Sequence, residues 1–306
     1  MLAIVIPYYK IRFFKATLQS LALQTDKRFK VYIGNDASNE DPIQLLEQFQ
    51  SQFDFEYQYY ETNLGSISLT QQWERCLAMV GNEYWVMILG DDDTIDSSCV
   101  AIFYQNKDQV ESENCKVIRY ATQVIDHNNA TLSEIYTHPE YETSTDFLMR
   151  KFKGGTRSSL SEFIFNKDAL LKHKFKDLPL AWFSDILAVL EVSNFGLIYT
   201  INEAVVQFRL SGDNITSRAD NLVLKNEATF EFFYYLIKEK KGFFNDEEST
   251  VLKHKLEKTF LDNKKKIRFW QLFTTLYFKN FYIRDYGCFL FKYFNTLLNQ
   301  IKKRFT

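Results

Sequence analysis

The sequence predicts an α/β fold: a Rossmann-like, mostly parallel sheet flanked by helices, with a C-terminal helical extension. Two observations predict it. Over residues 1–93, short apolar runs alternate with segments of helical spacing, as in parallel sheets covered by helices. Beyond residue 212 the pattern changes to long helical periodicity. A length of 306 residues is compatible with two domains, which we place at 1–215 and 216–306.

The individual elements follow from these patterns. A short apolar run such as 2–7 is typical of a strand buried on both faces. Strands are expected at 2–7, 30–35, 56–60 and 84–89, with helices at 13–23, 43–53 and 69–80. Later strands are expected at 116–120, 162–166, 197–201 and 205–209. Later helices are expected at 184–194, with Ser184 as its cap, and at 222–240. A further helix is expected after Asn245 and Glu248, which resemble a capping box.

Composition excludes several classes of protein. A hydrophobic content of 46% with 25% charged residues excludes disorder for most of the chain. Four cysteines without C-x-x-C spacing favour neither a disulfide framework nor a zinc site, and they fit a reducing, cytoplasmic compartment. Neither a signal peptide nor a membrane-spanning segment is expected. No G-x-S-x-G, P-loop or G-x-G-x-x-G motif supports a hydrolase, kinase or dehydrogenase.

The C-terminal segment is basic and aromatic. The net charge is −2, yet residues 263–306 contain ten Lys or Arg and a single acidic residue, Asp285. A basic excess confined to one tail is not typical of a nucleic-acid-binding domain. An amphipathic helix of this composition can bind an anionic membrane surface. Alternatively, the aromatics pack on the protein itself or on a second copy in a homodimer. They are Phe269, Trp270, Phe273, Tyr277, Phe278, Phe281, Tyr282, Tyr286, Phe289, Phe291, Tyr293 and Phe294.

Three adjacent carboxylates, Asp91 to Asp93, follow the expected strand at 84–89. Because like charges repel, a bound cation would stabilise such a turn. Carboxylate oxygens suit Mg²⁺ or Mn²⁺, which also hold phosphate oxygens. The alternative is a solvated acidic turn, with Asp96 as the N-cap of the next helix. After a buried strand in a βαβ array, the metal interpretation is favoured.

Two further carboxylates have a structural and a functional interpretation. Asp36 follows the second parallel strand, so it faces the same crevice as Asp91 to Asp93. It either forms an Asx-turn with Ser38 or accepts hydrogen bonds from a nucleotide base. Asp185 lies in the first turn of an expected helix, where the helix dipole favours a carboxylate. It could instead be a general base, although the residues alone favour the structural interpretation.

Four motifs occur in an order and spacing that define a resemblance. They are Ile4-Val5-Ile6-Pro7-Tyr8-Tyr9, Asn35-Asp36-Ala37-Ser38, Asn63-Leu64-Gly65 and Leu89-Gly90-Asp91-Asp92-Asp93. With them the chain resembles the family 2 glycosyltransferases, inverting enzymes of GT-A fold, of the type that builds bacterial surface polysaccharides. The likeness is strong over residues 1–105 and weak over 106–215.

The resemblance implies roles for the matching residues. The nucleotide sugar would contact Pro7, Tyr9, Asp36, Asn63, Gly65, Asp91 and Arg209, with Tyr9 stacked on the base and Asp36 on its edge. Asp92 would coordinate Mn²⁺ or Mg²⁺, with Asp93 supporting it at the metal. Asp185 would be the catalytic base, with Ser184 in place of the usual Glu. The family often has an aspartate where this chain has Gly90, which leaves open which carboxylates touch the metal.

The implied activity is inverting transfer from a UDP-sugar to a hydroxyl of a saccharide or lipid-linked acceptor. The setting would be capsule or lipopolysaccharide synthesis, with the protein peripheral on the inner face of the cell membrane. Residues 140–183 would form the acceptor groove, with Trp182 against a sugar ring. A sugar nucleotidyltransferase is one alternative, disfavoured because no glycine precedes Gly34. A non-catalytic, membrane-associated scaffold of the same fold is the other.

Overall fold

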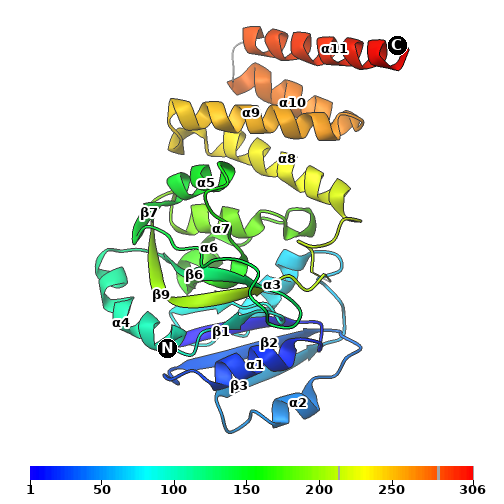
Figure 1. The fold of residues 1–306 in the computed structure, drawn as a ribbon. Coiled ribbons are helices and arrows are strands. Elements are labelled where there is room, and N and C mark those ends of the chain that lie inside the picture. The colour runs from blue at the N-terminus through cyan, green and yellow to red at the C-terminus, as the bar shows by residue number, and fades with distance from the viewer. Residues whose placement is uncertain (213, 281–282, 306) are drawn as a thin grey trace. The chain divides into compact units, whose positions relative to one another are not determined.

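The computed structural model describes residues 1–212, 214–280 and 283–305. Contacts divide the chain into two compact units, Met1–Asn221 and Leu222–Thr306. Figure 1 shows a sheet with covering helices in the first unit and successive helices in the second. We describe each unit by itself.

One half of the sheet in the first unit is parallel. Strand β1 (Leu2–Tyr8) pairs with β2 (Phe29–Asp36) and with β4 (Trp85–Ile88), and β2 pairs with β3 (Asp54–Tyr60). The connecting helices are α1 (Phe14–Ala22), α2 (Ile43–Glu47) and α3 (Leu69–Leu77). This half confirms the predicted alternation of strands and helices. Helix α2 is shorter than predicted because it buries only Leu46, and turns replace its later residues.

The other half of the sheet is mixed. The strand order is β3-β2-β1-β4-β8-β6-β9-β5, with β7 (Tyr141–Thr143) beside β9. Strand β8 (Phe163–Asn166) runs antiparallel to β4 and to β6 (Val117–Ile125). Strand β9 (Leu197–Arg209) runs parallel to β6 and antiparallel to β5 (Thr94–Ile95). The sequence predicts two strands, 197–201 and 205–209, where the structure has the single strand β9. The strand continues through the polar residues at 202–203 because its pairing with β6 shifts register beside Tyr120.

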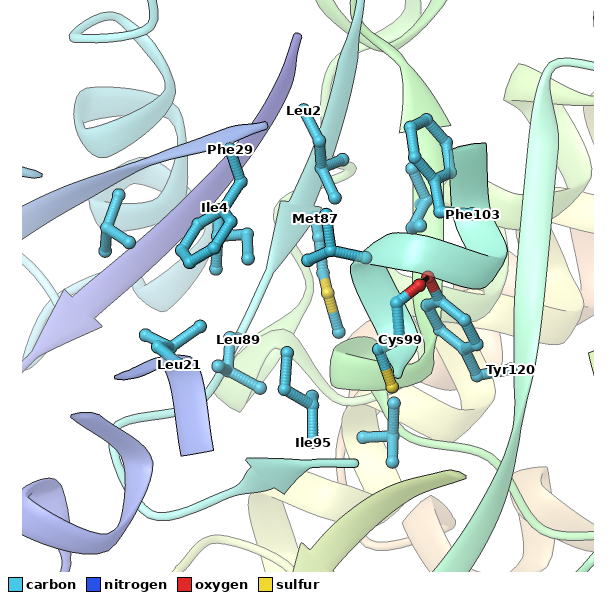
Figure 2. Close-up of a cluster of buried hydrophobic side chains, with 14 of the residues drawn as sticks. Leu2, Ile4, Leu21, Phe29, Met87, Leu89, Ile95, Cys99, Phe103 and Tyr120 are labelled. Carbon is cyan, nitrogen blue, oxygen red and sulfur yellow. Dashed lines mark hydrogen bonds between the residues drawn. The ribbon is translucent and has the colours of Figure 1, made fainter. Parts of the chain in front are cut away.

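A hydrophobic core fixes the strands under their helices. Alternate residues of β1, among them Leu2 and Ile4, pack against Leu21 of α1 and Phe103 of α4 (Cys99–Ser112), as Figure 2 shows. Each of these side chains is at most 1% exposed. Burying such a side chain contributes about 1.5–3 kcal/mol. The core therefore holds the carboxyl ends of β1 and β4 at fixed positions.

Two predicted helix caps are wrong. Asp96 does not cap α4, since its Oδ2 accepts a hydrogen bond from the Val205 amide of β9 at 3.1 Å. Ser184 does not cap α7 (Ser184–Val192), because its Oγ donates to the Lys176 carbonyl at 2.6 Å. Phe183 precedes α7 in a left-handed conformation with φ of 71°. In both cases a hydrogen bond to a residue outside the helix replaces the local one.

The remaining elements of the first unit lie between β6 and β9. They are α5 (Ser144–Phe152), the 3₁₀ turn η1 (Leu160–Glu162), α6 (Lys167–His173) and the 3₁₀ turn η2 (Pro179–Ala181).

The second unit consists of helices with an aromatic interior. Its elements are α8 (Leu222–Glu239), η3 (Lys241–Phe243), α9 (Asp246–Asn263), α10 (Ile267–Asn280) and α11 (Ile283–Phe305). The predicted capping box of Asn245 and Glu248 at the start of α9 is confirmed. Phe260 of α9 lies 4.3 Å from Phe273 of α10 and 5.7 Å from Phe289 of α11, measured between ring centroids.

Much of the aromatic tail is therefore the core of this unit. Phe269, Phe273 and Tyr277 are fully buried. The predicted membrane-binding residues Phe281 and Tyr282 lie outside the described residues. No helix in the described part of the chain combines the length and hydropathy needed to cross a bilayer.

Candidate active site

A cavity of about 500 Å³ in the first unit brings together distant parts of the sequence. Its wall includes Pro7 at the end of β1, the acidic run Asp91–Asp93 after β4, Ser161 in η1, and Asp185 in α7. Five predicted binding residues are not part of this wall: Tyr9, Asp36, Asn63, Gly65 and Arg209. Cavities of this size accommodate small-molecule ligands.

Gly90 gives the acidic run its shape. Leu89 still pairs with β1, through its amide and the Val5 carbonyl at 2.9 Å. A Cβ at Gly90 would lie 3.1 Å from Asp93 Oδ2 and 3.2 Å from Asp92 Oδ1. A side chain there would crowd the two carboxylates, so glycine allows them to lie against the backbone. This accounts for the departure from the expected aspartate.

Asp91 fixes the loop that follows β1. Its Oδ2 accepts hydrogen bonds from the amides of Tyr9 and Lys10, both at 2.8 Å. Burial and the neighbouring charge of Asp92 raise the pKa of Asp91 to about 7, although the two amides oppose the rise. A positive charge nearby would favour the ionised form.

Asp93 is 3% exposed, and both of its oxygens are bonded within the protein. Oδ1 accepts from the Arg209 amide at 2.9 Å, and Oδ2 accepts from Ser161 Oγ at 2.5 Å. Ser161 Oγ also accepts from the Gly90 amide at 3.1 Å. Burial and the charge of Asp92 raise the pKa of Asp93 to about 7. These contacts favour a supporting role, and direct metal binding by Asp93 stays a prediction.

Arg209 lies behind the acidic run. Its side chain is fully buried, with Nε donating to the Asp92 carbonyl at 2.7 Å and Nη1 to the Asp126 carbonyl at 2.8 Å. Its guanidinium also lies 4.7 Å from the ring centroid of Phe13. Arg209 thus holds the backbone of the run, and it attracts the partly exposed Asp92 carboxylate electrostatically. Burial raises the pKa of Asp92.

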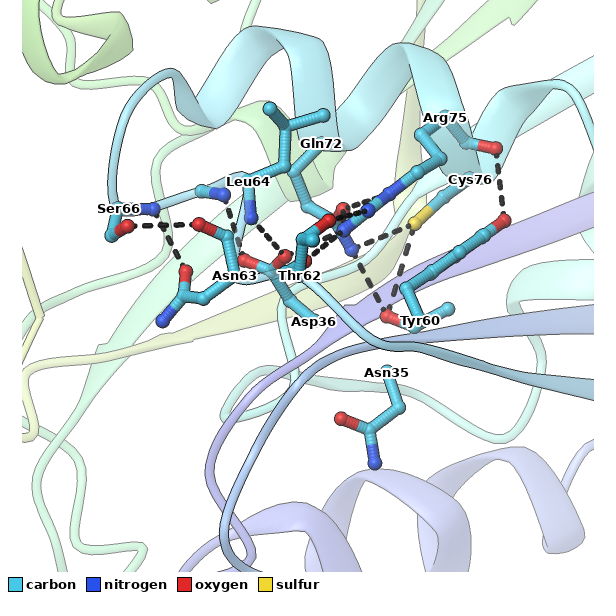
Figure 3. Close-up of polar contacts among 12 residues, drawn as sticks. Asn35, Asp36, Tyr60, Thr62, Asn63, Leu64, Ser66, Gln72, Arg75 and Cys76 are labelled. Atoms are coloured by element: carbon cyan, nitrogen blue, oxygen red, sulfur yellow. Dashed lines mark hydrogen bonds and ion pairs between the residues drawn. The ribbon is translucent and has the colours of Figure 1, made fainter.

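Asp36 belongs to a polar network between β2 and α3 (Figure 3). Its Oδ1 accepts from the Leu64 amide at 2.7 Å and from Arg75 Nη2 at 2.6 Å, and its Oδ2 from the Gly65 amide at 2.8 Å. The side chain is 4% exposed, and burial raises its pKa against these hydrogen bonds. Asn63 shapes the same turn by accepting from the Ser66 amide at 2.9 Å.

The turn after β2 is closed by a different residue from the one predicted. Asn35 Oδ1, not Asp36, accepts the hydrogen bond from the Ser38 amide, at 2.9 Å. Tyr9 is 42% exposed, and its carbonyl accepts from Ser38 Oγ at 2.6 Å. Base recognition by Asp36 and Tyr9 stays a prediction.

Asp185 follows a strained turn. Leu180, Ala181 and Phe183 have φ of 60°, 52° and 71°, in the left-handed region that residues other than glycine rarely adopt. Such strain is often found at binding and catalytic sites. Burial raises the pKa of Asp185, while the positive charges of Lys151 and Arg157 oppose the rise.

The sequence did not indicate Ser161 or Lys151 as site residues. Neither lies in a recognisable motif, and both reach the cavity only through the packing of η1 and α5. A serine and a lysine with no special spacing offer no local signal that could have identified them.

The carboxylate oxygens at the cavity suit a divalent cation that is bound partly by the protein and partly by the ligand. The described residues contain no group of three or more His, Cys, Asp or Glu side chains arranged to hold a metal ion. Mg²⁺ is commonly bound by one or two carboxylates together with substrate phosphates and waters. Asp92, partly exposed at the cavity, supplies one such carboxylate.

The fold and the acidic cavity together define a glycosyltransferase of GT-A type. The family model described as "Glycosyl transferase family 2" matches residues 3–170, more than half of the chain. The chain therefore belongs to glycosyl transferase family 2. No curated protein matches it.

Solved structures of similar fold come from S. aureus TarS. The crystal structure of TarS 1-349 has a TM-score of 0.60 at 13% identity, covering 85% of this chain and 72% of that one. The complex of TarS 1-349 with UDP-GlcNAc has a TM-score of 0.61 at 16% identity, covering 85% and 71%. At these identities the likeness shows the fold.

Proposed function

We propose that this protein transfers a sugar from a UDP-sugar to a hydroxyl of a saccharide or lipid-linked acceptor, with inversion at the anomeric carbon. One observation carries the proposal: the acidic run and Asp185, far apart in the sequence, line the same cavity. Membership of glycosyl transferase family 2 and the UDP-GlcNAc complex of a protein of similar fold support it. Synthesis of a bacterial capsule or lipopolysaccharide is the proposed setting.

Asp185 is the proposed general base. Its carboxylate accepts the proton of the acceptor hydroxyl while that oxygen bonds to the anomeric carbon. The bond between that carbon and the diphosphate breaks, and UDP leaves from the opposite face. Burial brings the pKa of Asp185 above its usual value, so it accepts a proton more readily than an exposed aspartate would.

The donor is proposed to bind along the ends of β1, β2 and β4. Pro7 would lie against the base, with Tyr9 and Asp36 contacting it and with Asn63, Gly65 and Asp91 shaping its site. Asp92 would hold Mn²⁺ or Mg²⁺ together with the diphosphate, supported by Asp93 and Arg209. Such a cation, when bound, stabilises the negative charge of the leaving diphosphate.

The surface of α11 supports peripheral binding to the inner face of the cell membrane. Ile283, Phe291, Phe294 and Leu298 are 70%, 69%, 54% and 54% exposed, and their spacing places them on one face of the helix. Arg284 and Lys292 in the same helix are also exposed. An apolar stripe with basic neighbours suits an anionic lipid surface.

Thermal stabilisation by UDP, GDP, dTDP and CMP, each with and without Mn²⁺, tests the donor class. We expect UDP with Mn²⁺ to raise the Tm, because a ligand at 100 times its Kd stabilises the folded state by about 2.7 kcal/mol. Asp92→Ala should lose the shift. Asp108→Ala is the matched control, since Asp108 is an acid on α4 whose side chain is 95% exposed. No shift with any nucleotide would favour the non-catalytic scaffold.

Replacing Asp185 by Asn tests the chemistry. The variant should keep the UDP shift but lose the release of UDP from a UDP-sugar in the presence of an acceptor oligosaccharide mixture. Pyrophosphate production from a sugar phosphate and UTP would instead identify a nucleotidyltransferase. Turnover by Asp185→Asn at the wild-type rate would exclude Asp185 as the base.

A further inference from the structure

Two cations, Lys151 and Arg157, line the cavity together with Asp185. Lys151 lies in the last turn of α5, and Arg157 lies in the loop before η1. In the part of the chain that the structure describes, neither forms an ion pair. Lys151 Nζ donates to Ser158 Oγ at 3.2 Å, a neutral partner.

Arg157 is held in place by an aromatic ring. Its guanidinium lies 4.2 Å from the ring centroid of Phe208, which also lines the cavity. Its Nη1 is shielded from solvent and has no hydrogen-bond partner among the residues that the structure describes. A shielded guanidinium donor without an acceptor is costly, so a shift of the side chain that brings this donor to an anion in the cavity would be stabilising.

Two nearby carboxylates have other partners, although Oε1 of Glu162 is buried without one among the described residues. Both oxygens of Asp93 are bonded to Arg209 and Ser161. Oε2 of the fully buried Glu162 accepts from the Ser159 amide at 2.9 Å. These acids reduce the electrostatic cost of burying the cations, but among the described residues neither acid forms an ion pair with Lys151 or Arg157.

The cations line the same cavity as the proposed base and act on it electrostatically. Lys151 and Arg157 both hold down the pKa of Asp185, and Asp185 is the carboxylate that acts most strongly on Lys151. If Asp185 takes the proton from the acceptor, as the proposed function requires, this wall of the cavity faces the acceptor. Trp182, in the strained turn before Asp185, lines the same cavity, and an indole ring can contact the apolar face of a sugar ring.

We propose, on the basis of the proposed function, that the acceptor is an acidic saccharide. Its carboxylate or phosphate group would bind Lys151 and Arg157, its sugar ring would lie against Trp182, and its hydroxyl would face Asp185. Arg157 offers directional donors to such a group, and Lys151 offers a compact charge. The neighbouring anion would orient the acceptor hydroxyl toward Asp185.

Matched pairs of small ligands test this proposal. Binding of glucuronate against glucose, and of glycerol 3-phosphate against glycerol, is measured by ligand-observed NMR with and without UDP and Mn²⁺. We expect the wild type to bind each acid at least tenfold more tightly than its neutral partner. Lys151→Met and Arg157→Met should lose most of this preference. Lys153→Met, which removes an exposed lysine just after α5, should keep it.

The Kd for UDP in the presence of Mn²⁺ shows whether Lys151 and Arg157 bind an acidic acceptor or the diphosphate of the donor. We expect this Kd to stay within twofold of wild type in Lys151→Met and Arg157→Met. A tenfold weaker UDP would assign the cations to the donor diphosphate and overturn the proposal, as would equal binding of acids and neutral ligands by the wild type. If Lys151→Met fails to fold, Lys151→Arg takes its place in the test. Because arginine keeps the positive charge, this variant should retain the preference for the acids. Absence of UDP binding by the wild type would contradict the donor proposal without affecting the acid preference.

Discussion

At the scale of single residues, Ser161 links two parts of the site that are distant in sequence. Its Oγ donates to Asp93 and accepts from the Gly90 amide. Ser161→Ala leaves both groups without this partner in a buried setting, which costs about 1–3 kcal/mol. We expect a lower urea midpoint and weaker Mn²⁺-dependent stabilisation by UDP. Ser112→Ala, at an exposed serine of α4, is the control and should leave both unchanged. Equal midpoints for the two variants would contradict this role.

Charge and chain position together indicated several of the carboxylates that line the cavity, and the roles of these residues stay predictions. Asp91 to Asp93 and Asp185 line one cavity because strand ends and helix starts meet at the same edge of the sheet. Lys151 and Ser161 could not be predicted in the same way. They reach the cavity through α5 and η1, whose packing leaves no local pattern in the sequence.

At the scale of elements, both the positions and the directions of the strands could be predicted for the parallel half of the sheet, whereas for the mixed half the sequence predicted only the positions of β6, β8 and β9. Strands β1, β2 and β4 are buried on both faces and separated by clear helical spacing, so their type and direction follow from the sequence. Strand β8 is short and lies between two antiparallel neighbours. Its direction depends on long-range pairing, which no local periodicity records.

The turn before α7 stores backbone strain, and Ala181 allows a measurement of it. The left-handed conformation costs a residue with a side chain roughly 1–2 kcal/mol, a cost that glycine avoids. Ala181→Gly should therefore be less destabilising than Ala188→Gly in α7 by about 2–3 kcal/mol, because glycine at 188 also loses about 1 kcal/mol of helix propensity. Both alanines are buried, so both variants lose one buried methyl group. Equal losses in urea unfolding would show that Ala181 carries no strain.

At the scale of the whole molecule, the aromatic residues of the C-terminal segment form two sets, one buried and one exposed. Phe269, Phe273 and Tyr277 form the interior of the second unit, whereas Phe291 and Phe294 point outward from α11. The sequence predicted aromatic helices but could not separate the two sets, because both repeat with helical spacing. Deleting 263–306 would remove core residues, so surface substitutions are the sharper test of membrane binding.

The paired variant Phe291→Ser and Phe294→Ser should reduce binding to anionic vesicles at least tenfold. Burying a phenylalanine at a lipid surface contributes up to about 1.5–3 kcal/mol, and both side chains are more than half exposed in the folded chain. Because they are exposed, the Tm should stay close to wild type. Sedimentation with phosphatidylcholine vesicles, with and without phosphatidylglycerol, measures the effect. Phe243→Ser, at a phenylalanine of η3 that is 47% exposed, is the control and should sediment like wild type. If the paired variant also sediments like wild type, α11 is not the membrane-binding surface.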